Sequence, residues 1–223
     1  MPNVLVNMAE GMLLSPPRLD IARIFPTQFM HAPTENHWGA VKRLLRYLNG
    51  THTLGIRLLA SSSLSLHSYS DADWDGNLDD RTSMGAYVMF LGANPISWRS
   101  TKQRIVARSS TEAEYRAIAS AAAEIQWIKS LLDDLRIPIS STPTLYSDNI
   151  GATYLSANPV FHSRMKHLAI DYHFVRDLVQ SSSLRVVHVS SRDQLADALT
   201  KSLPRPRLLD ICDKIGVASS TPS

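Results

Sequence analysis

The hydrophobic and polar positions of this 223-residue chain predict alternating strands and helices from residue 64 onward. Apolar runs with the length and alternation of strands span 64–71, 85–91, 95–98, 145–148 and 184–189. Apolar positions at helical spacing span 109–135, 149–157, 171–179 and 194–203. Three strands and a helix, followed by alternating strands and helices, predict a mixed α/β layer structure.

The first sixty residues have a weaker pattern. An amphipathic run from Glu35 to Asn49 follows Thr34 and ends at Gly50, which predicts one helix. Residues 54–59 predict a short strand, and residues 1–33 show no clean period. We therefore divide the chain into a first part (1–60) that is too fragmentary to bury a core alone, a main domain (64–217) and a small, polar tail (218–223) expected to be disordered.

Composition narrows the class of protein. One cysteine excludes an internal disulfide and a cysteine-rich zinc site, which favours a reducing, intracellular compartment. No apolar run approaches the ~20 residues of a membrane helix, so we expect no membrane partner. The net charge of +3 is a mild basic bias that permits a polyanionic partner without requiring one.

The predicted helix 109–135 carries an acidic residue on its apolar side. Two overlapping capping-box patterns at 109–114 specify its start. Glu114 lies within about 60° of the apolar stripe, whereas Glu112 lies on the opposite face. A carboxylate on the core side needs a cation, hydrogen-bond donors or a metal ion. The alternative is that Glu114 only complements the helix dipole, a role that Glu112 already fills.

Three aspartates repeat this arrangement on other elements. Asp71 and Asp148 end predicted strands, where functional sites gather in layered α/β proteins, and Asp197 lies in the predicted last helix. Each alone is a weak signal, because an aspartate after a strand is usually a turn former. Together with Glu114 they form four carboxylates that would repel one another without cations, and oxygen-only clusters suit Mg²⁺ or Mn²⁺.

Several ordered motifs resemble the ribonuclease H domain of copia-type LTR retrotransposon Pol polyproteins of plants. They are YSDADW at 69–74, SSTEAEYRA at 109–117, LYSDN at 145–149, NPVFHSR at 158–164, KH at 166–167 and QLAD at 194–197. The resemblance covers about 64–217. Residues 28–34 (QFMHAPT), 37–38 and 43–48 (RLLRYL) resemble the C-terminal end of the reverse transcriptase of the same polyproteins.

This resemblance implies a ribonuclease H-like fold, which is a five-stranded mixed sheet flanked by helices, preceded here by a partial helical reverse-transcriptase segment. It also implies an endonuclease that hydrolyses the RNA strand of RNA–DNA hybrids with two Mg²⁺ ions, for which Mn²⁺ can substitute. The family's catalytic and metal-binding carboxylates map onto Asp71, Glu114, Asp148 and Asp197. The polymerase aspartate motif would lie upstream, so no polymerase activity is expected. The alternative function is a catalytically idle remnant that at most binds nucleic acid.

Basic residues in two stretches are candidate contacts for the hybrid, with a solvated or structural role as the alternative. They are Arg99, Lys102, Arg104 and Arg108 before the long helix, and His162, Arg164, Lys166 and His167 before residue 171. The reverse transcriptase portion of the same element is a second candidate partner.

Three further residues near these motifs have open roles. Asp73 is expected on the same strand face as Asp71, and spacing alone does not decide which of them binds metal. Asp75 would alter metal affinity if it reached the ions, and the alternative, which its sequence context favours, is a solvated turn residue. His188 lies within a strand pattern and is a poor match for the loop histidine of many ribonucleases H, so we expect it to be structural.

Overall fold

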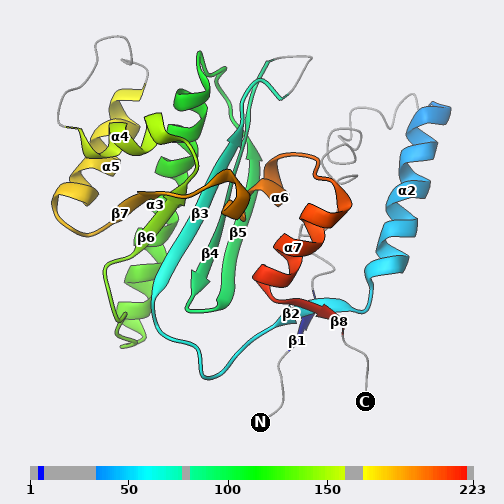
Figure 1. Ribbon diagram of the computed structural model, residues 1–223, viewed down its shortest axis with the longest axis horizontal. Coiled ribbons are helices and arrows are strands. Elements are labelled where there is room, and N and C mark those ends of the chain that lie inside the picture. The colour runs from blue at the N-terminus through cyan, green and yellow to red at the C-terminus, as the bar shows by residue number, and fades with distance from the viewer. Residues whose placement is uncertain (1–4, 8–33, 77–80, 159–167, 220–223) are drawn as a thin grey trace.

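A computed structural model describes residues 5–7, 34–76, 81–158 and 168–219. Its centre is a five-stranded sheet in the order β5-β4-β3-β6-β7 (Figure 1). The strands are β3 (Leu66–Asp73), β4 (Met84–Leu91), β5 (Asn94–Lys102), β6 (Thr144–Ser147) and β7 (Arg185–His188). β3, β4 and β5 form an antiparallel meander, whereas β6 is parallel to both β3 and β7. The sheet is therefore mixed.

Helices cover both faces of this sheet, and two hydrophobic clusters fill the space beneath them. The helices are α3 (Ser110–Asp134), α4 (Ile150–Ala157), α5 (Ala169–Gln180), α6 (Asp197–Thr200) and α7 (Arg205–Ile215). On β4, Met89 belongs to the cluster with α3, and its neighbour Val88 belongs to the cluster with α7. This alternation follows from the two-residue period of a strand. The five-stranded mixed sheet flanked by helices confirms the predicted fold class.

The C-terminal region differs from its predicted helix at 194–203. A 3-10 turn (Ser191–Asp193) and the short helix α6 replace that helix, and α7 follows, which the sequence pattern did not predict. Two prolines flank the start of α7 and mask its helical period. Pro204 instead provides the extended residue before the first turn, and Gly216 ends the helix in the left-handed conformation with φ of 85°.

A second, small sheet joins the two ends of the chain. β2 (Leu54–Arg57) pairs with β1 (Leu5–Asn7) on one side and with β8 (Val217–Ser219) on the other, always antiparallel. The predicted disorder from residue 218 is therefore wrong for Ala218 and Ser219, because β2 offers them a partner strand far away in the sequence. Residues 220–223 lie outside the described residues.

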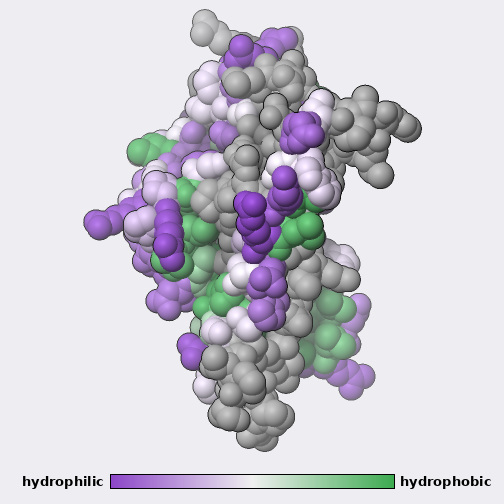
Figure 2. Space-filling view, turned by 90° about the vertical axis from the view of Figure 1, so that its right-hand side faces the viewer, coloured by the Kyte–Doolittle hydropathy of each residue, from purple (hydrophilic) through white to green (hydrophobic). Residues whose placement is uncertain are grey.

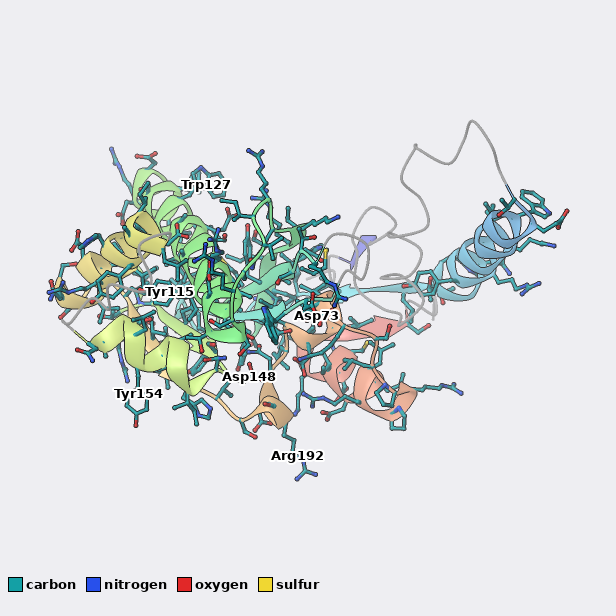
Figure 3. All side chains as sticks on the ribbon, turned by 90° about the horizontal axis from the view of Figure 1, so that it is seen from above. Asp73, Tyr115, Trp127, Asp148, Tyr154 and Arg192 are labelled. Carbon is teal, nitrogen blue, oxygen red and sulfur yellow. The ribbon has the colours of Figure 1, made fainter. Side chains whose placement is uncertain are left out.

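The predicted helix of the first part is present as α2 (Glu35–Thr51), which stands to one side of the rest of the molecule in Figures 1 and 3.

On the face in Figure 2, hydrophobic and hydrophilic residues alternate in small patches. Among the described helices, none has both the length and the apolar character needed to cross a membrane.

Candidate active site

Three of the predicted carboxylates converge at one end of the large sheet. Asp71, Asp148 and Asp197 each place a carboxylate oxygen within 4.8 Å of the other two. Asp71 is 1% exposed and Asp197 6%, while Asp148 is half-buried. In Figure 3, Asp148 lies near the middle of the molecule, whereas Tyr154 and Arg192 point outward. Three acids separated by 77 and 49 residues in the sequence thus form one cluster.

The fold brings them together through parallel pairing. β3 and β6 pair in register from His67 opposite Thr144 to Tyr69 opposite Tyr146. Asp71 and Asp148 each follow that last pair by two residues, so both lie at the same edge of the sheet. Asp197 is the first residue of α6, and this short helix places it next to Asp71 and Asp148.

Glu114 completes an acidic quartet with these three aspartates. It lies in the first part of α3, whose N-cap Ser109 accepts a hydrogen bond from the Glu112 backbone N–H at 3.2 Å. Burial, followed by the negative charges of Asp71 and Asp148, raises the pKa of Glu114 to about 9, against a backbone hydrogen bond from Ala72. Glu114 is thus protonated at neutral pH unless a cation compensates its charge.

Cationic and hydroxyl side chains surround the acidic quartet. Lys201, directly after α6, places its Nζ 2.8 Å from Oδ1 of Asp197 and 3.6 Å from Oδ2 of Asp71. Thr200 Oγ1 donates a hydrogen bond to Oδ2 of Asp71. Asp71 and Asp197 therefore each have a defined orientation.

Two more contacts involve Asp148 and Asp197. Ser191 Oγ donates to Oδ2 of Asp148 at 2.7 Å, and Nη2 of Arg207 lies 3.8 Å from Oδ2 of Asp197. Burial raises the pKa of Asp197 to about 6, although Lys201 opposes this shift. Burial opposes ionisation of Lys201, but the negative charges of Asp71, Asp197 and Asp148 raise its pKa above the usual value.

These observations fit divalent metal ions. The donors are all carboxylate oxygens, which Mg²⁺ and Mn²⁺ prefer. Within the described part of the chain, Oε2 of Glu114 is buried without a hydrogen-bond partner. The ammonium of Lys201 also shows that a positive charge is already accommodated between Asp71 and Asp197. The acidic quartet is therefore suited to bind cations.

Two neighbouring acidic residues lie outside the acidic quartet. Asp73, at the end of β3, is half-buried and is not among the three aspartates whose carboxylate oxygens converge. Asp75 has a positive φ of 58° and pairs with Arg81 at 2.8 Å on the surface. This is the arrangement of a turn residue, as its sequence context indicated.

The predicted nucleic-acid contacts fall into two groups. Arg99, Lys102, Arg104 and Arg108 are all exposed, on β5 and on the segment between β5 and α3. His162, Arg164, Lys166 and His167 lie outside the described residues. For the first group the structure therefore provides accessible cations beside the helix that carries Glu114.

His188 is the last residue of β7 and pairs with Ser147, which directly precedes Asp148. It is exposed and lines a cavity with Ile150, Thr153 and Tyr154. The predicted strand assignment of His188 is confirmed, and its structural role stays a prediction.

Sequence reasoning missed the residues that hold the acidic quartet in place. Lys201 lies four residues after Asp197, so helical spacing could have paired them. Thr200, Ser191 and Arg207 gave no such signal, because their partners are remote in the sequence or belong to elements that were not predicted.

Curated relatives are similar to almost the whole chain. The chain is 55% identical over 219 residues to the Retrovirus-related Pol polyprotein from transposon RE2 of Arabidopsis thaliana, which covers 98% of this chain and 15% of that protein. It is 59% identical over 197 residues to the polyprotein from transposon RE1 of the same plant, covering 88% and 13%. The chain therefore spans only about one seventh of the length of these relatives. No protein-family model matches it.

Solved structures provide a further comparison. One is LC11-RNase H1, isolated from compost by a metagenomic approach, with a TM-score of 0.47 and 18% identity over 61% of this chain and 93% of that chain. The same enzyme in complex with an RNA/DNA hybrid gives a TM-score of 0.46 and 16% identity, covering 61% and 94%.

Proposed function

Because this chain belongs to the Pol polyproteins of copia-type retrotransposons, we propose that it is a metal-dependent ribonuclease H that hydrolyses the RNA strand of RNA–DNA hybrids. The observation that carries the proposal is the convergence of Asp71 on β3, Asp148 between β6 and α4, and Asp197 on α6, with Glu114 of α3 close to Asp71 and Asp148. Such a cluster is costly to bury without cations, and it occurs at the sheet edge where sites form in this class of fold.

We assign the acidic quartet to the metal ions by position. Asp71, Asp148 and Asp197, whose carboxylate oxygens lie within 4.8 Å of one another, would hold the ions together with Glu114, whose carboxyl group lies close to Asp71 and Asp148. Two Mg²⁺ ions, or Mn²⁺ in their place, would supply activation of the attacking water and stabilisation of the leaving 3′-oxygen.

The other side chains then prepare this site. Thr200 donates to Oδ2 of Asp71 and Ser191 donates to Oδ2 of Asp148, so each hydroxyl orients one of these carboxylates. Glu114 would release its proton when a cation binds, because metal ligands bind in the deprotonated form. Lys201 would leave its place between Asp71 and Asp197, or remain beside Asp197 alone.

The substrate part of the proposal is supported by the exposed cations. Arg99, Lys102, Arg104 and Arg108 can neutralise backbone phosphates without reading sequence. Discrimination of RNA from DNA would come from contacts to 2′-hydroxyls in the shallow minor groove.

A second proposed partner is the reverse transcriptase portion of the same polyprotein. α2 lies in the part of the chain that resembles the end of that enzyme. Its Trp38 is 54% exposed and its Leu45 55% exposed, so both side chains are available to contact that portion.

The test is cleavage of an end-labelled RNA–DNA hybrid by Asp148→Asn. We expect the variant to lose about 10³-fold or more in rate, equivalent to ~4 kcal/mol, because an amide replaces a charged ligand. Binding of the hybrid in EDTA should survive. Asp177→Asn is the matched control, since Asp177 is exposed on α5.

Two outcomes would change the proposal. Cleavage retained by Asp148→Asn would remove Asp148 from the site. A folded wild-type protein that cleaves with neither Mg²⁺ nor Mn²⁺ would favour the idle remnant instead.

A further inference from the structure

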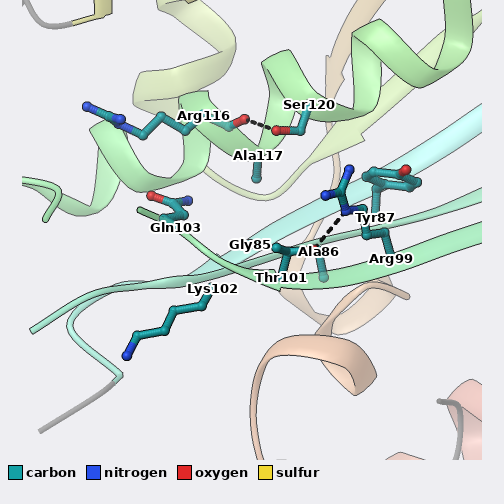
Figure 4. Close-up of a pocket in the computed structure, with 10 residues that line it drawn as sticks. All are labelled: Gly85, Ala86, Tyr87, Arg99, Thr101, Lys102, Gln103, Arg116, Ala117 and Ser120. Carbon is teal, nitrogen blue, oxygen red and sulfur yellow. Dashed lines mark hydrogen bonds between the residues drawn. The ribbon is translucent and has the colours of Figure 1, made fainter. Parts of the chain in front are cut away.

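Two largely buried arginines lie on helices near the acidic quartet. Arg116 of α3 lines a pocket between β5 and that helix (Figure 4), and its side chain is 14% exposed. It pairs with Glu112 at 2.8 Å and interacts with the charge of Asp171, so its own charge is compensated there. The side chain of Arg207 on α7 is 21% exposed, and it instead contacts the chain between β7 and α6, which leads to Asp197.

The guanidinium of Arg207 joins several positions of that segment. Its Nη2 donates a hydrogen bond to the Ser191 carbonyl at 3.0 Å and lies 3.4 Å from the Gln194 carbonyl. The same nitrogen lies 3.8 Å from Oδ2 of Asp197. Nη1 donates to Oδ2 of Asp210 at 3.1 Å, which holds the guanidinium from the side of its own helix.

The two carbonyls that Arg207 contacts belong to residues whose side chains reach the site. Oγ of Ser191 donates to Oδ2 of Asp148 at 2.7 Å. Gln194 is fully buried, and its Nε2 donates at 2.9 Å to the carbonyl of Ser70, directly before an aspartate of the acidic quartet. One guanidinium is therefore connected to two of the converging aspartates through one intervening residue each, and it approaches the third directly.

α7 has a second contact with the 3-10 turn, and the two contacts differ in burial. Nζ of Lys214 lies 3.3 Å from Oδ1 of Asp193, and these side chains are 40% and 58% exposed. Exposed ion pairs contribute little to stability. The less exposed guanidinium of Arg207 therefore provides the firmer contact between α7 and this turn.

The contacts of Arg207 require the shape of a guanidinium as well as its charge. A guanidinium presents its N–H donors in a rigid planar fork, whereas an ammonium is a point charge on a flexible stem. In Arg207, Nη1 is held by Asp210 while Nη2 reaches the carbonyls of the turn. A lysine in this place would keep a positive charge near Asp197 but would not bridge the two sides.

From these contacts we infer that Arg207 is a positioning residue for the acidic quartet. It fixes residues 191–194 through their carbonyls, and it thereby orients Asp148 through Ser191 and Asp197 directly. The orientation of the acids is a property of the metal-free protein, and only its consequence for metal binding rests on the proposed function.

The test is Arg207→Lys, with Arg205→Lys as the matched control, because Arg205 is exposed on the first turn of the same helix. Both changes retain the charge, so a difference between them reports the loss of the fork. The carboxyl carbon resonances of the aspartates, recorded in EDTA at one fixed pH, report each environment without metal. We expect Arg207→Lys to shift the resonances of Asp148 and Asp197, and Arg205→Lys to shift neither.

A second variant tests the route from Arg207 to Asp148. In a Ser191→Ala background the hydroxyl that connects them is missing, so Arg207→Lys should shift the resonance of Asp197 alone. A shift of Asp148 that is equally large with and without the Ser191 hydroxyl would overturn the inference. So would a lowered melting temperature in Arg207→Lys with both resonances unchanged, because that is the result expected if Arg207 only docks α7.

Melting temperatures establish first that each variant is folded. If Arg207→Lys does not fold, Asp210→Asn carries the same test, because it removes only the charge of the acceptor of Nη1 at the surface. We expect the same two resonances to shift by a smaller amount in Asp210→Asn. Unchanged resonances in that variant would then overturn the inference.

Calorimetric titration with Mg²⁺ connects this geometry to the proposed function. We expect the affinity to fall about 10-fold in Arg207→Lys, as is typical when a group that orients a metal ligand is lost, and to stay unchanged in Arg205→Lys. Equal affinities in the two variants would overturn a role of Arg207 in metal binding. A wild-type protein that does not bind Mg²⁺ or does not cleave the hybrid would reject the proposed reaction only, since the resonances in EDTA decide the role of Arg207 separately.

Discussion

At the scale of single residues, burial and neighbouring charges together determine the protonation state of each acid in the acidic quartet. Glu114 is 6% exposed and close to Asp71 and Asp148, and both effects favour its protonated form. Asp197 is equally buried, but the ammonium of Lys201 lies 2.8 Å away and limits the rise of its pKa. The side chains closest to each acid thus decide which of them carries a proton.

This balance predicts how stability depends on pH without metal. The pKa of Glu114 is about 9 in the folded chain and near 4.5 in the unfolded chain, so the folded state binds more protons between these values. The free energy of unfolding therefore falls as pH rises through this window, and Asp197 adds to the fall up to about pH 6.

Melting temperatures in EDTA across that window provide the measurement. Wild type should melt at progressively lower temperatures toward high pH, and Glu114→Gln should show a flatter profile because it has no proton to lose. Mg²⁺ should remove most of the decline, since it compensates the charge of the ionised carboxylate. Parallel profiles for wild type and Glu114→Gln would show that Glu114 is not the group responsible.

The acids themselves could be proposed from the sequence because each combines a charge with an apolar neighbourhood. Glu114 stood out on a helical stripe, and Asp71 and Asp148 stood out at strand ends. The groups that orient them could not, because the hydrogen bond from Thr200 to Asp71 joins residues 129 positions apart. Such contacts depend on tertiary structure and not on local periodicity.

At the scale of elements, the segment from β7 to α6 fastens the acidic quartet to the sheet. Its Gln194 is fully buried and donates to the Ser70 carbonyl at 2.9 Å, directly beside Asp71. Ser191 holds Asp148, and α6 supplies Asp197 and Thr200 within a single turn. A helix of four residues thus positions two of the four acids.

The role of α6 predicts the effect of removing one hydroxyl. Thr200→Val has nearly the same shape but leaves an oxygen of the buried Asp71 without its donor. We expect a loss of about 1–3 kcal/mol in the free energy of unfolding. Mg²⁺ affinity should fall about 10–100-fold, as is typical when a group that orients a metal ligand is lost.

Thr200→Ser is the matched variant, because it retains the hydroxyl and loses a methyl group. Calorimetric titration with Mg²⁺ separates the two roles of Thr200. Restored affinity in Thr200→Ser together with weak binding in Thr200→Val would assign the effect to the hydrogen bond. Equal affinities in both variants would mean that Thr200 only packs against the sheet.

The strands of the large sheet and the long helix followed from the sequence pattern, whereas α7 and β8 did not. The long helix was expected at 109–135 and spans 110–134, since its capping residues and apolar stripe are local signals. α7 was missed because prolines interrupt its period, and β8 because it has only three residues and depends on β2 for its hydrogen bonds.

At the scale of the whole molecule, the first part of the chain enters the core of the second. Ile56 of β2 is 2% exposed and belongs to the cluster that contains Ile211 and Ile215 of α7. β2 is also the strand to which the C-terminal β8 is paired. The sequence-based division at about residue 60 therefore separates segments that share a hydrophobic cluster and a sheet.

The last prediction compares two shortened chains. A chain from Thr53 retains β2, whereas a chain from Ser61 lacks β2 and exposes part of the cluster beneath α7. Loss of the Ile56 side chain alone costs about 3 kcal/mol by analogy with large-to-small core substitutions. For a chain of this size that corresponds to a melting temperature lower by about 6–12 °C.

We expect the chain from Ser61 to melt at least that much below the chain from Thr53, and Ile56→Ala in the full chain to account for much of the difference. The rest of the difference in melting temperature would arise because β8 loses its partner strand when β2 is removed. Identical melting temperatures for the two shortened chains would mean that residues 64–217 form their core alone. In that case the pairing of β2 with β8 would be a surface contact, and a boundary near residue 60 would be the true domain limit.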